Sequence, residues 1–352
     1  MNNQSTKHQF GEYDSLSSVN AKRHFVNFHS GFTLLELMIS LVLGLLVSAI
    51  AVQLFLTSQR SATAQQGMMN LQNSTLFGLG EVVNHIRIAN LNSSRPIIND
   101  KVLYGGVVLS PDNISDNRDA TTGALNFTIA SNLLTRGAIG PSNLDSQNSD
   151  QLVIQYRVLT PNQFDCEGTG LTVSDYVVER YFLRADTNKN DPNQPLALAC
   201  KAARYTEAEA KTKTTLNLTG NGEIIIPRVD HFSVRLGVAY DGANAACNAV
   251  TETNASGATT NIEADNHLDC FGYMSIEEYR ALTGGKPQIV SVQIGLLVRS
   301  IDTVGNNPFF DANQSYQVLN VDAKLTANDR NKLYLRSAVT QSIAIRNGFG
   351  VE

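Results

Sequence analysis

The sequence has no tryptophan, few charged residues and no excess of positive charge. Charged side chains make up 17% of the 352 residues, and the formal net charge is -5. Proteins that bind nucleic acid through its phosphates usually carry a basic surface, so this composition argues against that class. Aromatic residues are only 7% of the chain. The sequence therefore gives no sign of an aromatic groove on which bases or sugars could stack.

Motifs of the common enzyme classes are also missing. The chain has no GxSxG elbow, no HExxH, no GxxxxGK[ST] and no GxGxxG after a predicted strand. The six histidines are scattered: His8, His24 and His29 precede residue 31, and His85, His231 and His267 are interpreted as ordinary surface or helix residues. We expect a protein that is not an enzyme and has no cofactor and no metal site.

Cysteine is scarce, with four residues and no CxxC pair to suggest zinc. Four cysteines are too few for a fold built on disulfides, but they could pair in an oxidising compartment. Proximity in sequence favours Cys166 with Cys200 and Cys247 with Cys270. Three connectivities remain open, as does a set of free buried thiols.

One long apolar run is present, from Phe32 to Leu56. It is 25 residues long and contains a single charged residue, Glu36. A helix of that length measures about 38 Å, enough to span a hydrocarbon core of about 30 Å with some tilt. Lys22 and Arg23 lie just before the run, and short basic flanks stay cytoplasmic. We expect one membrane helix with everything after it outside the cytoplasm, where cysteines can be oxidised.

The rest of the chain predicts a long helix followed by a β-rich domain. Thr57 to Asn90 contains no proline, and its apolar residues recur at three- or four-residue steps, as in an amphipathic helix. After Pro96, short runs rich in β-formers predict strands. These are Leu103–Leu109, Leu152–Leu159, Tyr176–Leu183, Phe232–Tyr240, Ile289–Val298 and Leu333–Ile345.

The predicted fold class is α+β, with a long N-terminal helix packed on an antiparallel, β-rich C-terminal domain. A short helix is expected over Ser275–Leu282, because Ser275 can cap it and two glutamates follow in its first turn. Residues 241–262 are small and polar and predict a long excursion from the sheet.

The start of the apolar run carries the most specific signal. A small residue, Gly31, precedes Phe32, and the only acid of the run, Glu36, follows four residues later. An unpaired carboxylate inside a membrane is unfavourable by roughly 3 kcal/mol on insertion scales, so a partner is implied. Cleavage between Gly31 and Phe32 would expose an α-amino group one helical turn from Glu36. That amine could neutralise Glu36, or the same glutamate in an adjacent subunit.

The continuous sequence GFTLLELMISLVLGLLVSAIAVQLFL resembles the prepilin N-terminus. It is most similar to that of the PilW-type minor pilins of type IV pili. The later segments VDHFSVRLGVAYDG, IVSVQIGLLVRS and LYLRSAVTQSIAIRN resemble that group more loosely. The strong similarity covers about 60 residues and the weak similarity a similar number, while the middle of the chain has little.

The resemblance implies a role for each residue of the junction. A membrane prepilin peptidase would cleave between Gly31 and Phe32, Phe32 would become N-methylphenylalanine, and Glu36 would guide assembly. The chain would divide into a leader (1–31), an assembly helix (32–56), an amphipathic helix (57–95) and an extracytoplasmic pilin domain (96–352).

The implied partners and location follow from the same family. The partners are other minor pilins, the major pilin, the prepilin peptidase and the inner-membrane assembly machinery. The protein would lie in the inner membrane with a periplasmic domain, and after assembly in a surface pilus, where it would act in the tip or initiation complex. Whether that pilus serves adhesion, twitching or DNA uptake stays open.

Several alternatives remain. Within the class, a type II secretion pseudopilin shares the N-terminal helix. From another class come a membrane-tethered envelope enzyme, an ordinary membrane anchor with an incidental glutamate, and a signal peptide cleaved after Ala51. An adhesin role for residues 96–270 is a further possibility. The leader is longer than such leaders usually are, and translation from the codon of Val19 would shorten it while keeping Lys22 and Arg23.

Overall fold

The structure is a computed structural model of the whole chain. It describes residues 31–187, 195–241, 251–253, 256–257, 259–261, 268, 270–303 and 311–348. The chain forms two compact units, Met1–Leu56 and Thr57–Glu352. The described helices are α1 (Leu34–Ile88), α2 (Glu207–Ala210), α3 (Ile276–Ala281) and α4 (Ala327–Arg330), with short 3-10 helices η1 (Pro111–Asn113) and η2 (Ser131–Leu133).

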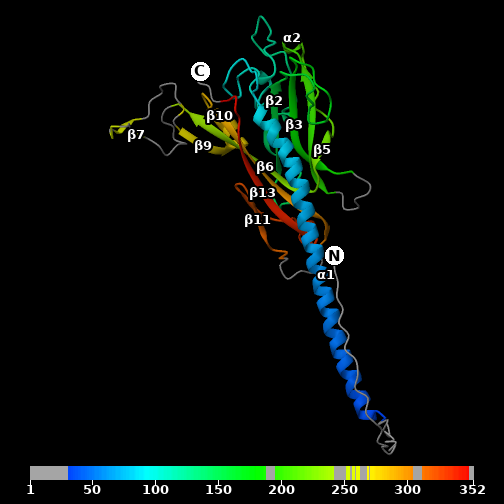
Figure 1. Cartoon of the computed structure of the whole chain (residues 1–352). Helices are drawn as coiled ribbons and strands as arrows, with labels where there is room; N and C mark the ends of the chain where they lie inside the picture. The colour runs from blue at the N-terminus through cyan, green and yellow to red at the C-terminus, as the bar shows by residue number, and fades with distance from the viewer. Residues whose placement is uncertain are drawn as a thin grey trace, which may run out of the picture. The chain divides into compact units, whose positions relative to one another are not determined.

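The β-rich unit contains two main sheets. The first has the strand order β1-β2-β3-β4-β5 and the second the order β13-β10-β6-β9 (Figure 1). The strands of the first sheet are β1 (Arg136–Gly140), β2 (Ser149–Arg157), β3 (Tyr176–Ala185), β4 (Leu196–Tyr205) and β5 (Glu223–Ile226). Those of the second are β6 (Val229–Tyr240), β9 (Cys270–Ser275), β10 (Gln288–Thr303) and β13 (Tyr334–Ala344).

Two short hairpins complete the described strands: β7 (Thr251–Thr253) with β8 (Thr259–Asn261), and β11 (Ser315–Val318) with β12 (Val321–Lys324). Every pairing between named strands is antiparallel. The predicted α+β class, with its antiparallel β-rich domain, is confirmed.

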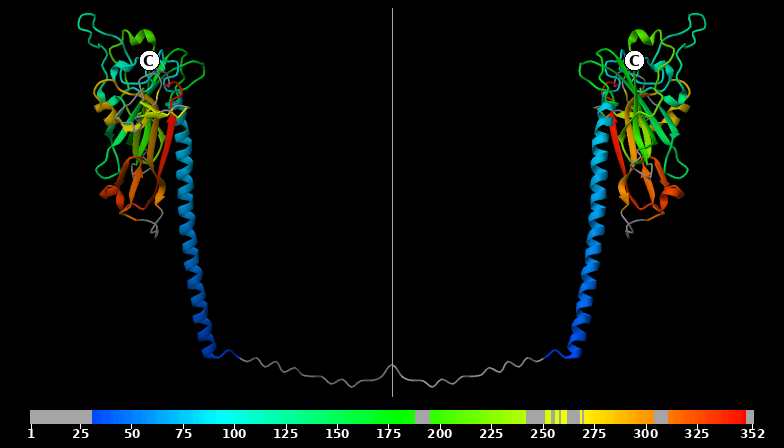
Figure 2. Two further views of the ribbon diagram at one scale, coloured as in Figure 1. Left: turned by 90° about the vertical axis from the view of Figure 1, so that its left-hand side faces the viewer. Right: turned by 90° about the vertical axis from the view of Figure 1, so that its right-hand side faces the viewer.

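The main core lies where the second half of α1 meets both sheets. Leu71, Leu79, Val82 and Ile86 of α1 are buried in one cluster with residues of β2, β3, β4, β6, β10 and β13. Figures 1 and 2 show β13 running beside this half of α1. The predicted packing of this helix on the β-rich domain is observed from Leu71 onward, whereas residues 57–70 and the side chains of Leu76 and Phe77 are not buried.

The end of α1 is fixed by the side chain of Asn90. The backbone of Asn90 is left-handed, with a φ of 63°, a conformation that asparagine tolerates better than most residues. Its side chain donates hydrogen bonds to the carbonyl oxygens of Asn347 (2.6 Å) and Arg95 (3.2 Å) and accepts one from the backbone of Gly106 (2.9 Å). The helix end is thus tied to the C-terminal region.

Five of the six predicted strands are present, but Leu103–Leu109 is wrong. In this segment the described residues form only an isolated bridge between Val107 and Ile154. The reason is Gly106, where an added Cβ would lie 2.4 Å from the nitrogen of Asn90. Residues 103–109 therefore pack closely against the end of α1 and do not form a strand of either sheet. Strand β4 was not predicted either, because its alanine-rich sequence has low β-propensity.

The short helix predicted over Ser275–Leu282 is confirmed as α3. Its cap is reciprocal: the hydroxyl of Ser275 accepts from the backbone of Glu278 at 3.2 Å, and the Glu278 carboxylate accepts from the backbone of Ser275 at 2.6 Å. This is the capping-box arrangement, which satisfies two backbone donors at once. Most of the predicted excursion, residues 241–262, lies outside the described residues.

Candidate assembly site and the buried anchor of α1

The first turn of α1 contains the acid that the sequence singled out. Thr33 immediately precedes the helix, and its hydroxyl accepts a hydrogen bond of 3.2 Å from the backbone of Glu36. Threonine is a favoured N-cap, and an acid in the first turn interacts well with the helix dipole. These preferences explain why α1 begins here.

The Glu36 carboxylate makes no hydrogen bond or ion pair with any described residue. Glu36 lies in the first turn of α1, and α1 is the one described helix that is long and apolar enough to cross a membrane. The apolar side chains from Leu34 to Leu56 are all exposed within the chain. A buried environment for this surface must therefore come from lipid or from other molecules.

Gly31, Phe32 and Glu36 lie close together because they are near one another in the sequence, and no tertiary contact among the described residues brings them together. Gly31 has open space around its Cα, and the Phe32 side chain is exposed. Both residues are therefore accessible to another molecule without unfolding of the described chain. The predicted leader, apart from Gly31, lies outside the described residues.

A second site was missed by sequence reasoning: a buried carboxylate on β3 that binds α1. Glu179 is fully buried, and its carboxylate lies 2.8 Å from Nδ1 of His85. It also accepts hydrogen bonds from the hydroxyls of Tyr181 (2.8 Å) and Tyr156 (3.0 Å) and from the backbone of Cys166 (3.0 Å). Such a carboxylate is stable only because its lone pairs are satisfied.

His85 is therefore not the ordinary helix residue that the sequence suggested. Its other ring nitrogen, Nε2, lies 3.0 Å from the carboxylate of Glu81 on the same helix. Burial lowers the pKa of His85, but the hydrogen bond and charge of Glu179, helped by Glu81, outweigh it, and the net pKa is raised. Burial, together with the charge of Glu179, raises the pKa of both Tyr181 and Tyr156, so the two hydroxyls stay protonated and donate to the carboxylate.

His231 on β6 is also buried rather than at the surface. Its Nδ1 lies 2.9 Å from the hydroxyl of Ser142, and burial lowers its pKa to about 4. The imidazole is therefore neutral near pH 7 and contributes to the interior as a polar core residue. The third histidine considered, His267, lies outside the described residues.

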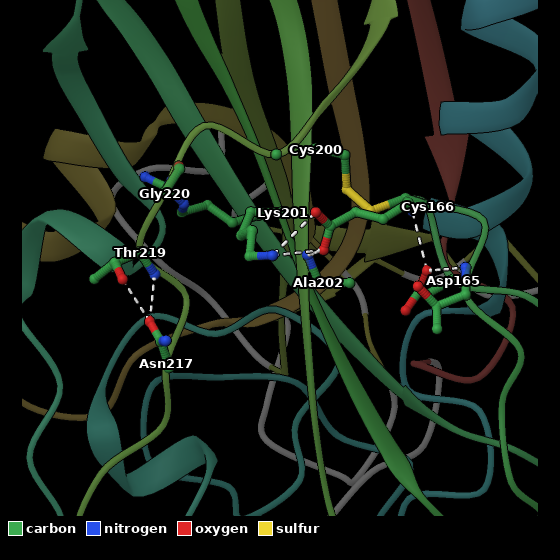
Figure 3. A network of polar contacts seen from close by, with 12 residues as sticks. Asp165, Cys166, Cys200, Lys201, Ala202, Asn217, Thr219 and Gly220 are labelled. Carbon is green, nitrogen blue, oxygen red and sulfur yellow. Dashed lines mark hydrogen bonds and ion pairs between the residues drawn. A yellow bond between two sulfur atoms is a disulfide. The ribbon is translucent and has the colours of Figure 1, made fainter.

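A disulfide lies next to the buried carboxylate of Glu179. Cys166 and Cys200, which are 34 residues apart, are bonded, as their proximity favoured. Figure 3 shows this bond and its surroundings. Nζ of Lys201, next to Cys200 in the sequence, lies 2.9 Å from the carboxylate of Glu167. The loop that carries Cys166 is further held by Arg204, 2.9 Å from the carboxylate of Asp165.

The predicted pairing of Cys247 with Cys270 can be followed only at Cys270. Cys270 is disulfide-bonded, and Cys247 lies outside the described residues. Cys166, Cys200 and Glu179 place three potential ligand atoms within 4.8 Å of one another. Because the two sulfurs are bonded to each other, they are not the thiolates that a zinc ion needs.

Comparisons with known protein families find matches at the N-terminal and C-terminal parts of the chain. Residues 180–347 match the family described as type IV pilus-assembly protein W (PilW), and residues 27–52 match the prokaryotic N-terminal methylation motif. The chain is thus similar to PilW over its C-terminal part and to prepilins over its N-terminal part. No curated protein matches the chain. Among solved structures, a type IV-like pilin from Thermus thermophilus is similar, with 12% identity, 60% of this chain and 81% of that chain covered, and a TM-score of 0.30.

Proposed function

We propose that this PilW-type chain is a structural minor pilin that enters a type IV pilus in its tip or initiation complex. The observation that carries the proposal is the first turn of α1. There the only acid of the exposed apolar run Phe32–Leu56 lies four residues after Phe32, and its carboxylate has no partner among the described residues. An acid so placed in a membrane or fibre interior needs a positive charge.

The roles of the junction residues follow from this requirement. A prepilin peptidase cuts the bond between Gly31 and Phe32, and the new amine of Phe32 is methylated. The amine lies one helical turn from Glu36. Its positive charge neutralises the Glu36 carboxylate of its own chain or of a neighbouring subunit. The segments 1–31, 32–56, 57–95 and 96–352 act as leader, assembly helix, amphipathic helix and extracytoplasmic pilin domain.

The partners in this proposal are the peptidase, the inner-membrane assembly machinery, other minor pilins and the major pilin. Before assembly the β-rich domain lies in the periplasm and the apolar helix in the inner membrane. After assembly the whole mature chain lies in the surface pilus. Lateral packing of the apolar helices is favoured by small residues, and Gly44, Ser48 and Ala49 allow close approach.

Intact-mass analysis of the protein purified from the cell envelope tests the processing step. The expected species begins at N-methylated Phe32. A product that begins at Val52 would instead identify a cleaved signal peptide. A chain that keeps residues 1–31 while it still assembles would overturn the proposal.

Substitution of Glu36 tests the assembly step. Glu36→Gln keeps the size of the side chain and removes its charge, so the variant should reach the membrane and be processed, yet be lost from sheared pili. The matched control is Glu223→Gln at an exposed position on β5, which should assemble normally. Normal pili with failed protein secretion on deletion would favour a pseudopilin, and an activity that survives Glu36→Gln would favour an envelope enzyme.

A further inference from the structure

The β-rich unit contains a cavity of about 780 Å³ beside the segment that follows α1. Three segments supply most of its wall: residues 94–103, the end of β6, and residues 285–288, where β10 begins. Ligand sites in proteins typically have volumes of about 300–1,000 Å³. The cavity is therefore of a size to hold a ligand.

Positive charge predominates in the cavity wall, although the chain as a whole carries a net charge of -5. The basic residues of the wall are Arg95, Lys101 and Lys286, and the acidic ones are Asp100 and Asp241. Lys286 is already neutralised, because its Nζ lies 3.1 Å from the carboxylate of Asp100. Two cations and a single acid, Asp241, then remain to face a ligand.

Arg95 and Lys101 are the cations of the wall that the fold leaves unpaired. Both residues are exposed, and neither side chain makes a hydrogen bond or ion pair with a described residue. Cations in a concave wall attract an anion more strongly than cations on an open surface, because the low-dielectric walls focus the field. The arginine fork can also bind a carboxylate through two parallel hydrogen bonds.

The cavity also offers apolar surface to a ligand. Leu103, Tyr240 and Leu268 line it, and each keeps part of its surface exposed. A ligand that covers these side chains removes apolar surface from water, which favours binding. The ligand that fits therefore combines negative charge with apolar groups.

The neutral hydrogen-bonding side chains of the wall are already engaged within the fold. The carboxamide oxygen of Asn99 accepts hydrogen bonds from the backbones of Lys101 (2.9 Å) and Val102 (3.0 Å). The side-chain amide of Gln288 donates to the backbone carbonyl of Gly348. A saccharide needs such groups for its many hydroxyls, since each hydroxyl is both a donor and an acceptor. A peptide that alternates acidic and apolar side chains needs only the charge and the apolar surface.

We propose that this cavity binds an acidic, partly apolar peptide segment of another protein, with Arg95 and Lys101 holding its carboxylates. Such binding goes beyond the structural role proposed above, and it does not require assembly of a pilus. The purified chain should therefore show it whether or not the chain enters a fibre.

Selection from a library of short randomised peptides tests the binding, with the full-length protein in detergent as the target. The expected peptides are rich in aspartate and glutamate, with apolar residues between them. Replacement of their acidic residues by the matching amides should abolish binding. A higher salt concentration should weaken it, because salt screens charges near the surface.

The double variant Arg95→Gln/Lys101→Gln tests the site. Loss of both cations should weaken binding of the selected peptides by roughly tenfold. The matched control is Lys211→Gln/Lys324→Gln, which removes the same charge at two exposed positions outside the cavity wall and should bind like the wild type. Both double variants should keep the wild-type melting temperature, because surface substitutions of this kind change stability little.

Four outcomes of these measurements would overturn the proposal. They are a failure to select any peptide, selected peptides without an excess of acidic residues, unchanged affinity in the Arg95/Lys101 variant, and equal losses in both double variants. Polygalacturonate, an acidic polysaccharide, and vesicles that contain an anionic lipid are the comparison ligands. Tighter binding of either than of the selected peptides, lost in the Arg95/Lys101 variant, would assign the cavity to a saccharide or a membrane instead.

Discussion

Nδ1 of His85, on α1, lies 2.8 Å from the carboxylate of Glu179, on β3, although the two residues are 94 positions apart. The carboxylate is fully buried and is also bound by Tyr156, Tyr181 and the backbone of Cys166. This contact attaches the helix to the first sheet by a buried polar link at its centre. The surrounding apolar core also holds α1, and the buried link favours one register of the helix against β3.

Loss of the Glu179 carboxylate should destabilise the β-rich unit strongly. Glu179→Ala leaves His85 and two tyrosine hydroxyls without their partner, and breaking a buried pair in this way typically costs about 3–5 kcal/mol. Urea unfolding of the detergent-solubilised mature protein measures the change. Glu223→Ala, at an exposed position on β5, is the matched control and should change stability by less than about 0.5 kcal/mol. Similar values for both variants would show that the link is dispensable.

Stability should fall as the pH rises through the folded-state pKa of His85, because that pKa is raised above its ordinary value. The sign follows from proton linkage: the folded protein holds the proton more tightly than the unfolded chain does. The stabilisation is complete below the unfolded pKa of about 6.5 and disappears as the pH rises through the folded pKa. Unfolding curves for the wild type and for His85→Gln measure this effect. Their difference should shrink as the pH rises, and a difference that grows would contradict the assignment.

Removal of the Cys166–Cys200 disulfide should lower stability by about 4 kcal/mol on the chain-entropy account, because the bond closes a loop of 34 residues. The double variant Cys166→Ser/Cys200→Ser isolates this bond and leaves the disulfide of Cys270 intact. Urea unfolding under non-reducing conditions provides the measurement. The backbone N–H of Cys166 also binds Glu179, so we expect weaker protection of that amide from hydrogen exchange. An unchanged unfolding midpoint would exclude a stabilising role.

Gly78 and Gly80 should respond in opposite ways to the same substitution. Alanine at either position gains up to about 1 kcal/mol of helix propensity. At position 78 the new methyl group meets Ile226 and the carbonyl of Ile225, and overpacking of this kind typically costs about 1–3 kcal/mol. Gly78→Ala should therefore lower the melting temperature of the mature protein, while Gly80→Ala raises it slightly. Stabilisation by both would mean that α1 shifts on β5 without cost.

The sequence by itself determined the features that depend on residues near one another. The run Phe32–Leu56 predicts an apolar helix because its length and composition suffice, and Ser275 predicts α3 because capping is a three-residue interaction. The β-forming residues of Tyr176–Leu183 and Ile289–Val298 predict strands for the same reason. The order of Gly31, Phe32 and Glu36 was enough to indicate the junction, since one helical turn brings these residues together.

Tertiary structure decided what depends on residues distant in sequence. Leu103–Leu109 has the composition of a strand. Gly106 approaches Asn90 so closely, however, that the segment packs around the end of α1 and forms no strand. His85 and Glu179 give no local signal, because each is an ordinary residue until the sheet packs on the helix. The difference between Gly78 and Gly80 arises in the same way. Two glycines two positions apart on one helix differ because β5 lies against the first, whereas no described residue lies within 4 Å of a Cβ added at the second.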